Sequence, residues 1–140
     1  MCKKLTWQAK LYLFIVNLVG VTLTFYAFSR INSNIIYVII LWILIATPFE
    51  IRPIRVNSNL HTTLSFAIHL ALIIIYGQWV AIIVAAVVTA ITDIYGKKGL
   101  VKLCFNVSQF AIILYLAGTA FSALKQSNLL LELPGDLIAF

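Results

Sequence analysis

The residues that decide the fold are LHTTLSFAIHLALIIIYGQWVAIIVAAVVTAITDIY, which run from Leu60 to Tyr95. They form two apolar runs, 60–76 and 79–95, separated only by Gly77 and Gln78. Each run is close to the roughly 20 apolar residues that a helix needs to cross a bilayer. The stretch therefore predicts a tight hairpin of two membrane-spanning helices.

The composition of the whole chain agrees with a membrane location. Of its 140 residues, 63% are hydrophobic and 10% are charged, whereas an ordinary soluble domain has about 45–50% apolar and about 25% charged residues. A soluble chain of this length could not bury so much apolar surface in one small core. The composition argues against a soluble enzyme, a disordered protein and a disulfide scaffold, and favours an integral membrane protein with several spans.

Three further apolar runs complete an all-α integral membrane bundle in a single domain, 1–140. About five transmembrane helices are predicted, at residues 11–28, 33–49, 60–76, 79–95 and 103–123. Residues 124–140 are interpreted as a tail or as the start of an incomplete sixth span, because this apolar segment is interrupted by Glu132, Pro134 and Asp136. Between the second and third runs, Pro48 and Pro53 predict that Phe49–Val56 continues neither helix.

Small and aromatic residues indicate how the predicted hairpin packs. The fourth run carries alanines at spacings that let helix backbones approach closely in lipid, namely Ala81, Ala85, Ala86 and Ala90. Tyr76 and Trp79 flank the turn and are interpreted as interfacial anchors.

The basic residues predict the topology of the bundle. The net charge is +6, from ten Lys and Arg against four Asp and Glu. Alternate segments starting from the N-terminus hold eight of the ten cations, Lys3, Lys4, Lys10, Arg52, Arg55, Lys97, Lys98 and Lys102, and the other segments hold Arg30 and Lys125. Lys and Arg in short loops favour the cytoplasmic side, so the N-terminus is predicted to be cytoplasmic. The cations are explained by topology, and no nucleic-acid partner is expected.

Motifs for catalysis, cofactors or metals are lacking in the sequence. There is no glycine-rich phosphate loop, no pair of carboxylates and no Cys/His cluster with metal-ligand spacing. Cys2 and Cys104 have neither disulfide-framework nor metal spacing, and Cys104 is interpreted as a small buried hydrophobe. We expect no enzyme activity, no cofactor and no metal.

Polar side chains inside apolar runs are the candidate functional residues. Lys102, Asn106 and Gln109 share one helix face, where the two amides could bind a ligand or hydrogen-bond a neighbouring helix. The second role is the more common one in bundles. Asn17 in the first span is interpreted as a packing contact.

A second polar stripe consists of His61, Ser65 and His69, spaced four residues apart. The histidines are two helical turns apart, about 12 Å, so they cannot bind one metal ion from a straight helix. A paired-haem or pH-sensing role is one interpretation. The commoner alternative is an interfacial His61 and a packed, hydrogen-bonded His69.

Thr89, Thr92 and Asp93 cluster at the end of the fourth run. Asp93 could take part in a cation or proton pathway, but such a pathway usually needs a second acid deeper in the membrane. The simpler interpretation is a surface pair between Asp93 and Lys97, one turn away.

Several segments together resemble the N-terminal multi-span membrane region of bacterial HD-GYP-type and GGDEF-type signalling proteins. The segments are Leu64-Ser-Phe-Ala-Ile, Tyr76-Gly-Gln-Trp, the turn at Asp93, Lys102-Leu-Cys-Phe-Asn106-Val-Ser-Gln109 and Tyr115-Leu-Ala-Gly118. Asn106 and Gln109 match the Phe-Asn-x-x-Gln element of that group, whereas Cys104 stands where the group usually has a bulky aliphatic residue.

The resemblance implies a non-catalytic sensor or anchor module in the bacterial inner membrane. Members of the group continue into a cytoplasmic signalling domain, which these 140 residues do not contain, so such a module would belong to a longer or split protein. Its partners would be the lipid bilayer, a second copy of itself or a cytoplasmic effector, and a small-molecule ligand of unknown identity.

Two alternatives remain open from the sequence. One is a vitamin-like small-molecule-binding subunit of an energy-coupling-factor-type transporter, in which Phe49–Val56 would be the loop near the binding site. The other is a fragment with no activity of its own.

Overall fold

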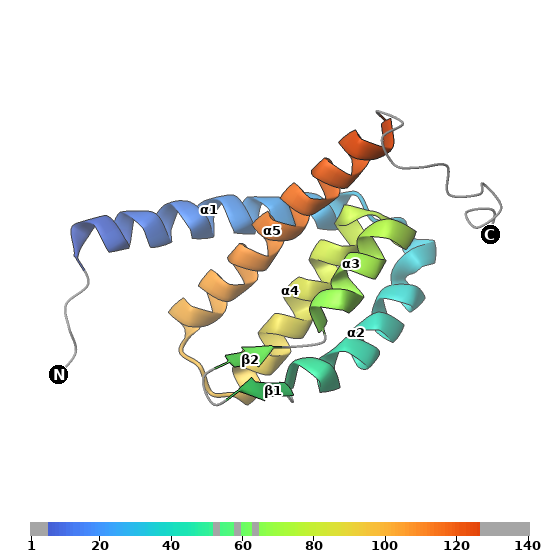
Figure 1. Ribbon diagram of the computed structural model, residues 1–140. Helices are drawn as coiled ribbons and strands as arrows, with labels where there is room; N and C mark the ends of the chain where they lie inside the picture. Colours follow the sequence, from blue (N-terminus) through green and yellow to red (C-terminus); the bar gives the residue numbers. More distant parts are fainter. Residues whose placement is uncertain (1–5, 52–53, 58–59, 63–64, 127–140) are drawn as a thin grey trace.

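The computed structural model describes residues 6–51, 54–57, 60–62 and 65–126. In chain order the elements are α1 (Trp7–Ser29), the 3-10 turn η1 (Ser33–Ile35), α2 (Ile36–Ile51), β1 (Ile54–Asn57), β2 (Leu60–Thr62), α3 (Ser65–Tyr76), α4 (Gln78–Tyr95) and α5 (Leu100–Gln126) (Figure 1). The architecture is a helical bundle with one short antiparallel hairpin of strands.

Helix α4 forms the centre of the bundle and contacts the other four helices. In Figure 1, α5 lies on one side of α4, and α3 and α2 lie on the other. A helix that is apolar on all sides is suited to full burial. Ala81, Ala85 and Ala86 are buried and Ala90 is half-buried, and the close approach predicted at these alanines stays a prediction.

Among the described residues, four helical segments are long and apolar enough to cross a membrane, at residues 7–29, 33–51, 78–95 and 100–126. Their outward surfaces carry large exposed apolar side chains, among them Phe14, Leu18, Leu44 and Leu116, which are compatible with contact to lipid. Helix α3 has only 12 residues. At a rise of 1.5 Å per residue it is about 18 Å long, shorter than the roughly 30 Å hydrocarbon core.

The predicted third span, 60–76, is wrong in its first residues. Leu60–Thr62 is strand β2, which pairs antiparallel with β1. The paired segments contain the β-branched residues Ile54, Val56 and Thr62, which favour strands. His61 therefore lies on a strand, and the predicted helical stripe keeps only Ser65 and His69.

The prediction that Phe49–Val56 continues neither helix is also wrong in part, because α2 runs through Pro48 and ends at Ile51. Proline removes one backbone hydrogen bond from a helix. Membrane helices tolerate this where nearby Ser or Thr side chains bond to the backbone. Thr47 makes a bond of this kind beside the proline, since its Oγ1 donates to the Ile43 carbonyl at 2.6 Å, although the carbonyl that Pro48 leaves without a helical donor is that of Leu44.

Side-chain contacts show which helix ends lie together. Tyr12 of α1 packs edge-on against Phe105 of α5, with ring centroids 6.1 Å apart. Asp93, near the end of α4, bonds to Asn106 of α5. The starts of α1 and α5 and the end of α4 therefore share one end of the bundle, which we call the Lys98 end.

An aromatic cluster marks the opposite end, which we call the Arg30 end. The Trp79 ring lies 5.1 Å from Tyr26 of α1 and 5.8 Å from Tyr115 of α5, centroid to centroid. The Arg30 guanidinium lies 4.9 Å from the centre of the Tyr26 ring. Trp79, which was predicted as an interfacial anchor, thus packs between helices.

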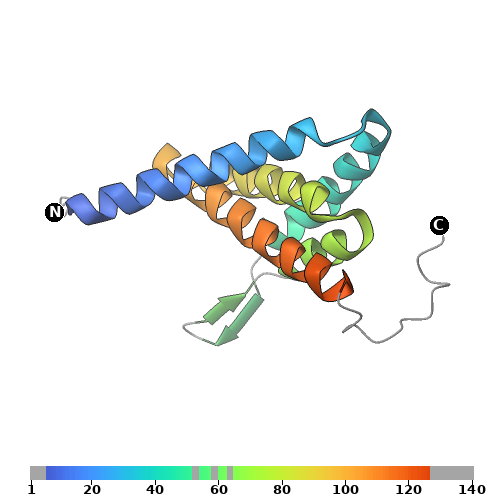
Figure 2. The same ribbon diagram turned by 90° about the horizontal axis from the view of Figure 1, so that it is seen from above.

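Two glycines allow α5 to approach its neighbours closely. A Cβ on Gly20 of α1 would lie 2.3 Å from the Cα of Ser108, and a Cβ on Gly118 of α5 would lie 2.4 Å from the Cβ of Gln78. Both distances are too short for any real contact. The α1–α5 crossing in Figure 2 therefore requires a residue without a side chain at position 20.

We expect Gly20→Ala to destabilise the protein by about 1–3 kcal/mol, because the added methyl group overpacks the crossing. The sign of the change in stability is informative, because Gly→Ala inside a helix otherwise stabilises a protein by about 1 kcal/mol. Thermal unfolding in detergent measures the effect. Gly99→Ala is the control, because its Cβ would meet no atom within 4 Å. An unchanged or higher unfolding temperature for Gly20→Ala would contradict the tight crossing.

Candidate functional site

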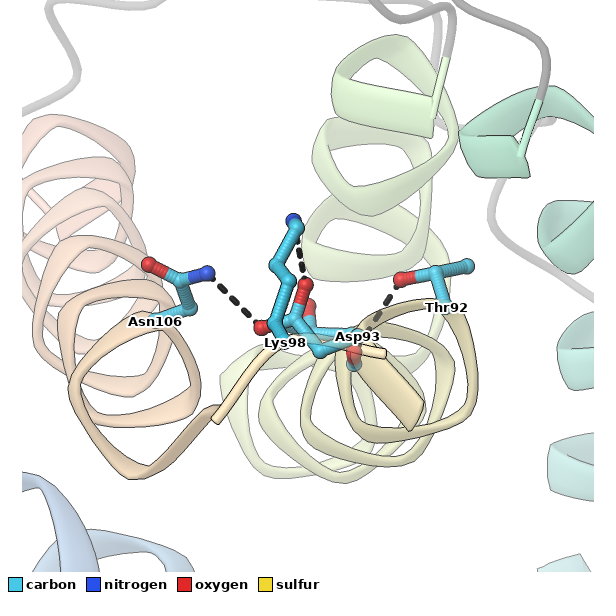
Figure 3. A network of polar contacts seen from close by, with 5 residues as sticks. Thr92, Asp93, Lys98 and Asn106 are labelled. Carbon is cyan, nitrogen blue, oxygen red and sulfur yellow. Dashed lines mark hydrogen bonds and ion pairs between the residues drawn. The ribbon is translucent and has the colours of Figure 1, made fainter. Parts of the chain in front are cut away.

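The most connected polar group in the described residues is Asp93, near the end of α4. It is 1% exposed. Its Oδ1 lies 2.5 Å from Nζ of Lys98, and its Oδ2 accepts a hydrogen bond of 2.7 Å from Nδ2 of Asn106. Figure 3 shows Asn106 reaching across from α5 while Lys98 folds back from the turn. The carboxylate therefore links α4, the turn and α5.

The backbone of the turn directs Lys98 toward Asp93. The N–H of Lys98 donates to the Asp93 carbonyl at 2.9 Å, and the N–H of Lys97 donates to the Ile94 carbonyl at 3.0 Å. This is the hydrogen-bond pattern of the Schellman motif, which requires a left-handed residue. Lys97 occupies that position, with φ of 50°.

The predicted surface pair between Asp93 and Lys97 is wrong. The partner is Lys98, and the carboxylate is buried. The i,i+4 rule assumes that the helix continues. Here α4 ends at Tyr95, and the left-handed residue turns the following side chain back onto the helix end.

The predicted polar face of α5 separates into three different environments. Asn106 is bonded to Asp93, and Lys102 is exposed. Gln109 is half-buried and makes no hydrogen bond with any residue that the structure describes. Of these three side chains, only that of Asn106 forms a hydrogen bond to another helix within the described part of the chain.

His69 is the most deeply buried ionisable group on α3. It is 1% exposed, and neither of its ring nitrogens has a hydrogen-bond partner among the described residues. Its ring packs edge-on to Phe110 of α5, with centroids 5.9 Å apart. The expectation of a packed His69 holds, whereas the expected hydrogen bond is not found in this part of the chain.

Four other buried polar atoms also lack a hydrogen-bond partner among the described residues. They are Oγ1 of Thr89, Oγ of Ser108, Oδ1 of Asn17 and Oε1 of Gln78. Ser108 and Gln78 are the residues that face the two close-approach glycines. Sequence reasoning missed this role, since a glycine and its partner lie on different helices.

A further polar contact joins the end of α2 to the start of α3. Ser65 is fully buried, and its hydroxyl donates to Oε2 of Glu50. The sequence singled out Ser65 as part of a histidine stripe. It gave no signal for the pairing with Glu50, because the two residues are 15 positions apart and the path between them is not helical.

The thiol and metal predictions have separate outcomes. Cys104 is exposed on α5, so its interpretation as a small buried hydrophobe is wrong. It shares a helix face with the buried Ser108 and Ala111 but lies one turn nearer the start of α5, where the side chain is exposed. Within residues 6–51 and 65–126 and the two strands, no three His, Cys, Asp or Glu residues are close enough to hold a metal ion.

No family model, no curated protein and no solved structure matches this chain significantly. The molecule is therefore assigned by its own structure to a class, that of helical proteins with four membrane-length segments.

We expect Lys97→Gly to be more stable than Lys97→Ala by about 1 kcal/mol, because an L-residue in the left-handed region is strained whereas glycine is not. The alanine variant is the matched control, since both substitutions remove the same charge. Chemical or thermal unfolding in detergent measures the difference. Equal stability of the two variants would contradict a left-handed residue at position 97.

We expect Asn106→Leu to destabilise the bundle by about 1.5–3 kcal/mol, because it removes a hydrogen bond to a buried carboxylate. Gln109→Leu is the matched control on the same helix and should be nearly neutral. Unfolding in detergent measures both variants. Equal effects of the two substitutions would show that Asn106 does not hold α5 to α4.

Proposed function

We propose that this chain is a non-catalytic, multi-pass sensor or anchor module of a bacterial signalling protein in the inner membrane. In this proposal a ligand or a change in the membrane repacks the helices, and a cytoplasmic effector responds. The observation that carries the proposal is His69, buried without a hydrogen-bond partner among the described residues.

A buried polar group without a partner costs about 1–3 kcal/mol. Ionisable side chains inside membrane bundles are rare, and most of them have a functional role. A leucine at position 69 would pack without this cost. The presence of a histidine there supports a role in which another group hydrogen-bonds the ring in one state of the protein.

The position of His69 supports a mechanism by helix repacking. It lies on α3, the shortest helix, which is joined to α4 only through Gly77. The start of α3 is tied to α2 by the bond between Ser65 and Glu50. A ligand that binds better to one arrangement of α3 shifts the population toward it, and the Ser65–Glu50 contact would transmit the shift to the end of α2.

The distribution of cations supports a cytoplasmic N-terminus. Lys10 and Lys102 lie in the first turns of α1 and α5, and Lys97 and Lys98 follow α4, all at the Lys98 end. Arg30 and Lys125 belong to the opposite ends of α1 and α5. This asymmetry agrees with the positive-inside rule. In the five-segment topology that we favour, α3 returns the chain to the Arg30 end, although it is shorter than a full span.

We expect His69→Leu to leave the stability unchanged or to raise it by up to about 3 kcal/mol, since it removes unpaired polar atoms from the core. We also expect it to abolish retention of any small molecule that copurifies with the wild-type protein. Unfolding in detergent measures the first effect, and native mass spectrometry measures the second. Ile73→Leu, a volume-conserving change at another buried position of α3, is the control and should retain the ligand.

Different outcomes separate the possible roles of His69. Strong destabilisation by His69→Leu would show a structural role and overturn the proposal. Retention of the same ligand by wild type and His69→Leu would exclude His69 from the site. A retained vitamin-like metabolite, lost in His69→Leu, would favour the transporter subunit over the sensor.

A further inference from the structure

A groove runs between the C-terminal halves of α3 and α5. It consists of two adjoining hollows of about 540 and 260 Å³, which share Ile73, Ile74 and Phe121. We call it the α3/α5 groove, lined among others by Leu70 and Ile74 on α3, by Gly77 directly after α3, and by Ala120, Phe121 and Lys125 on α5. Its lining is mostly apolar, with one cation near the end of α5.

The groove exists because the two helices differ in length and in side-chain size. Helix α3 has 12 residues and α5 has 27, and the last turns of α5 rise past α3 in Figure 1. Gly77 has no side chain, and Ala117 and Ala120 are small. The result is a hollow that no described residue fills.

The chain itself leads into this groove. Lys125 and Gln126, the last residues of α5, are part of the lining. After Ser127 and Asn128, the sequence continues with an apolar segment, Leu129–Phe140. We propose that Leu129–Phe140 docks into the α3/α5 groove and covers α3 and the end of α5.

Charge complementarity supports this occupant. Lys125 makes no ion pair with any described residue. The chain has four acids, of which Glu50 bonds to Ser65 and Asp93 bonds to Lys98. The other two, Glu132 and Asp136, lie in Leu129–Phe140. The segment thus supplies both apolar side chains and the counter-charge that the groove lacks.

Tethering also favours the segment over a free occupant. A two-residue linker holds the segment near the groove at an effective concentration on the order of millimolar. A lipid chain or a second copy of the protein could fill the apolar part, and the experiment below distinguishes these occupants.

The experiment is disulfide cross-linking of the full chain in membranes. Leu131→Cys is combined with Ile74→Cys in a background in which Cys2 and Cys104 are replaced by serine. The matched control combines Leu131→Cys with Ile75→Cys. Ile74 and Ile75 are adjacent and equally exposed, at 62% and 61%, but only Ile74 lines the groove.

We expect an intramolecular disulfide at position 74 to form about tenfold faster than at position 75, because a disulfide needs Cα atoms within roughly 7 Å. Intact mass and migration on non-reducing gels identify the product. Equal rates, or no intramolecular product at either position, would overturn the proposal. A disulfide-linked dimer as the main product would assign the groove to a second copy.

A second pair of variants tests the groove without a cross-link. Ala120→Trp fills the groove, whereas Ala123→Trp adds the same side chain on an exposed position outside its lining. With Leu131→Cys as the only thiol, we expect Ala120→Trp to raise the rate of maleimide labelling severalfold and Ala123→Trp to leave it unchanged. Equal labelling rates in both variants would overturn the proposal and favour lipid in the groove.

Discussion

The enclosure of α4 by the other four helices is the constraint on which the rest of the structure depends. A helix that is buried along most of its length must be apolar there, and each polar group that it buries without a partner is costly. The alanines at positions 81, 85 and 86 are among the buried residues of this helix. Asp93 is the costliest residue of this helix to bury, and the turn after α4 is shaped so that Lys98 and Asn106 reach it.

Most of the coarse architecture could be predicted from the sequence, because it depends on patterns within single helices. Apolar runs predicted the helices, Gly77 indicated the turn of the hairpin, and the spacing of alanines in 81–90 indicated the packed face of α4. The run 60–76 was misread because hydrophobicity alone does not separate a short strand from the start of a helix. Helix α2 continues through Pro48 to Ile51, as membrane helices tolerate and as rules for soluble chains do not anticipate.

The candidate site was less predictable, because it depends on contacts between helices. Asp93 and Asn106 were each selected from the sequence, but nothing in a linear pattern indicates that they bond to each other across 13 positions. The choice of Lys98 over Lys97 follows from one left-handed backbone conformation. The Gly20–Ser108 contact requires a helix crossing that no single-sequence pattern defines.

The buried polar groups fall into two classes, those that have hydrogen-bond partners and those that have none among the described residues. Asp93 is fully engaged, so it holds α4 and α5 together, and a ligand would have to break existing bonds to use it. His69 is buried at the same depth but makes no hydrogen bond with the described residues. It can therefore accept a new partner without losing an old one. In the proposed mechanism this difference would make α3 the element that a ligand moves, with α4 and α5 as the frame.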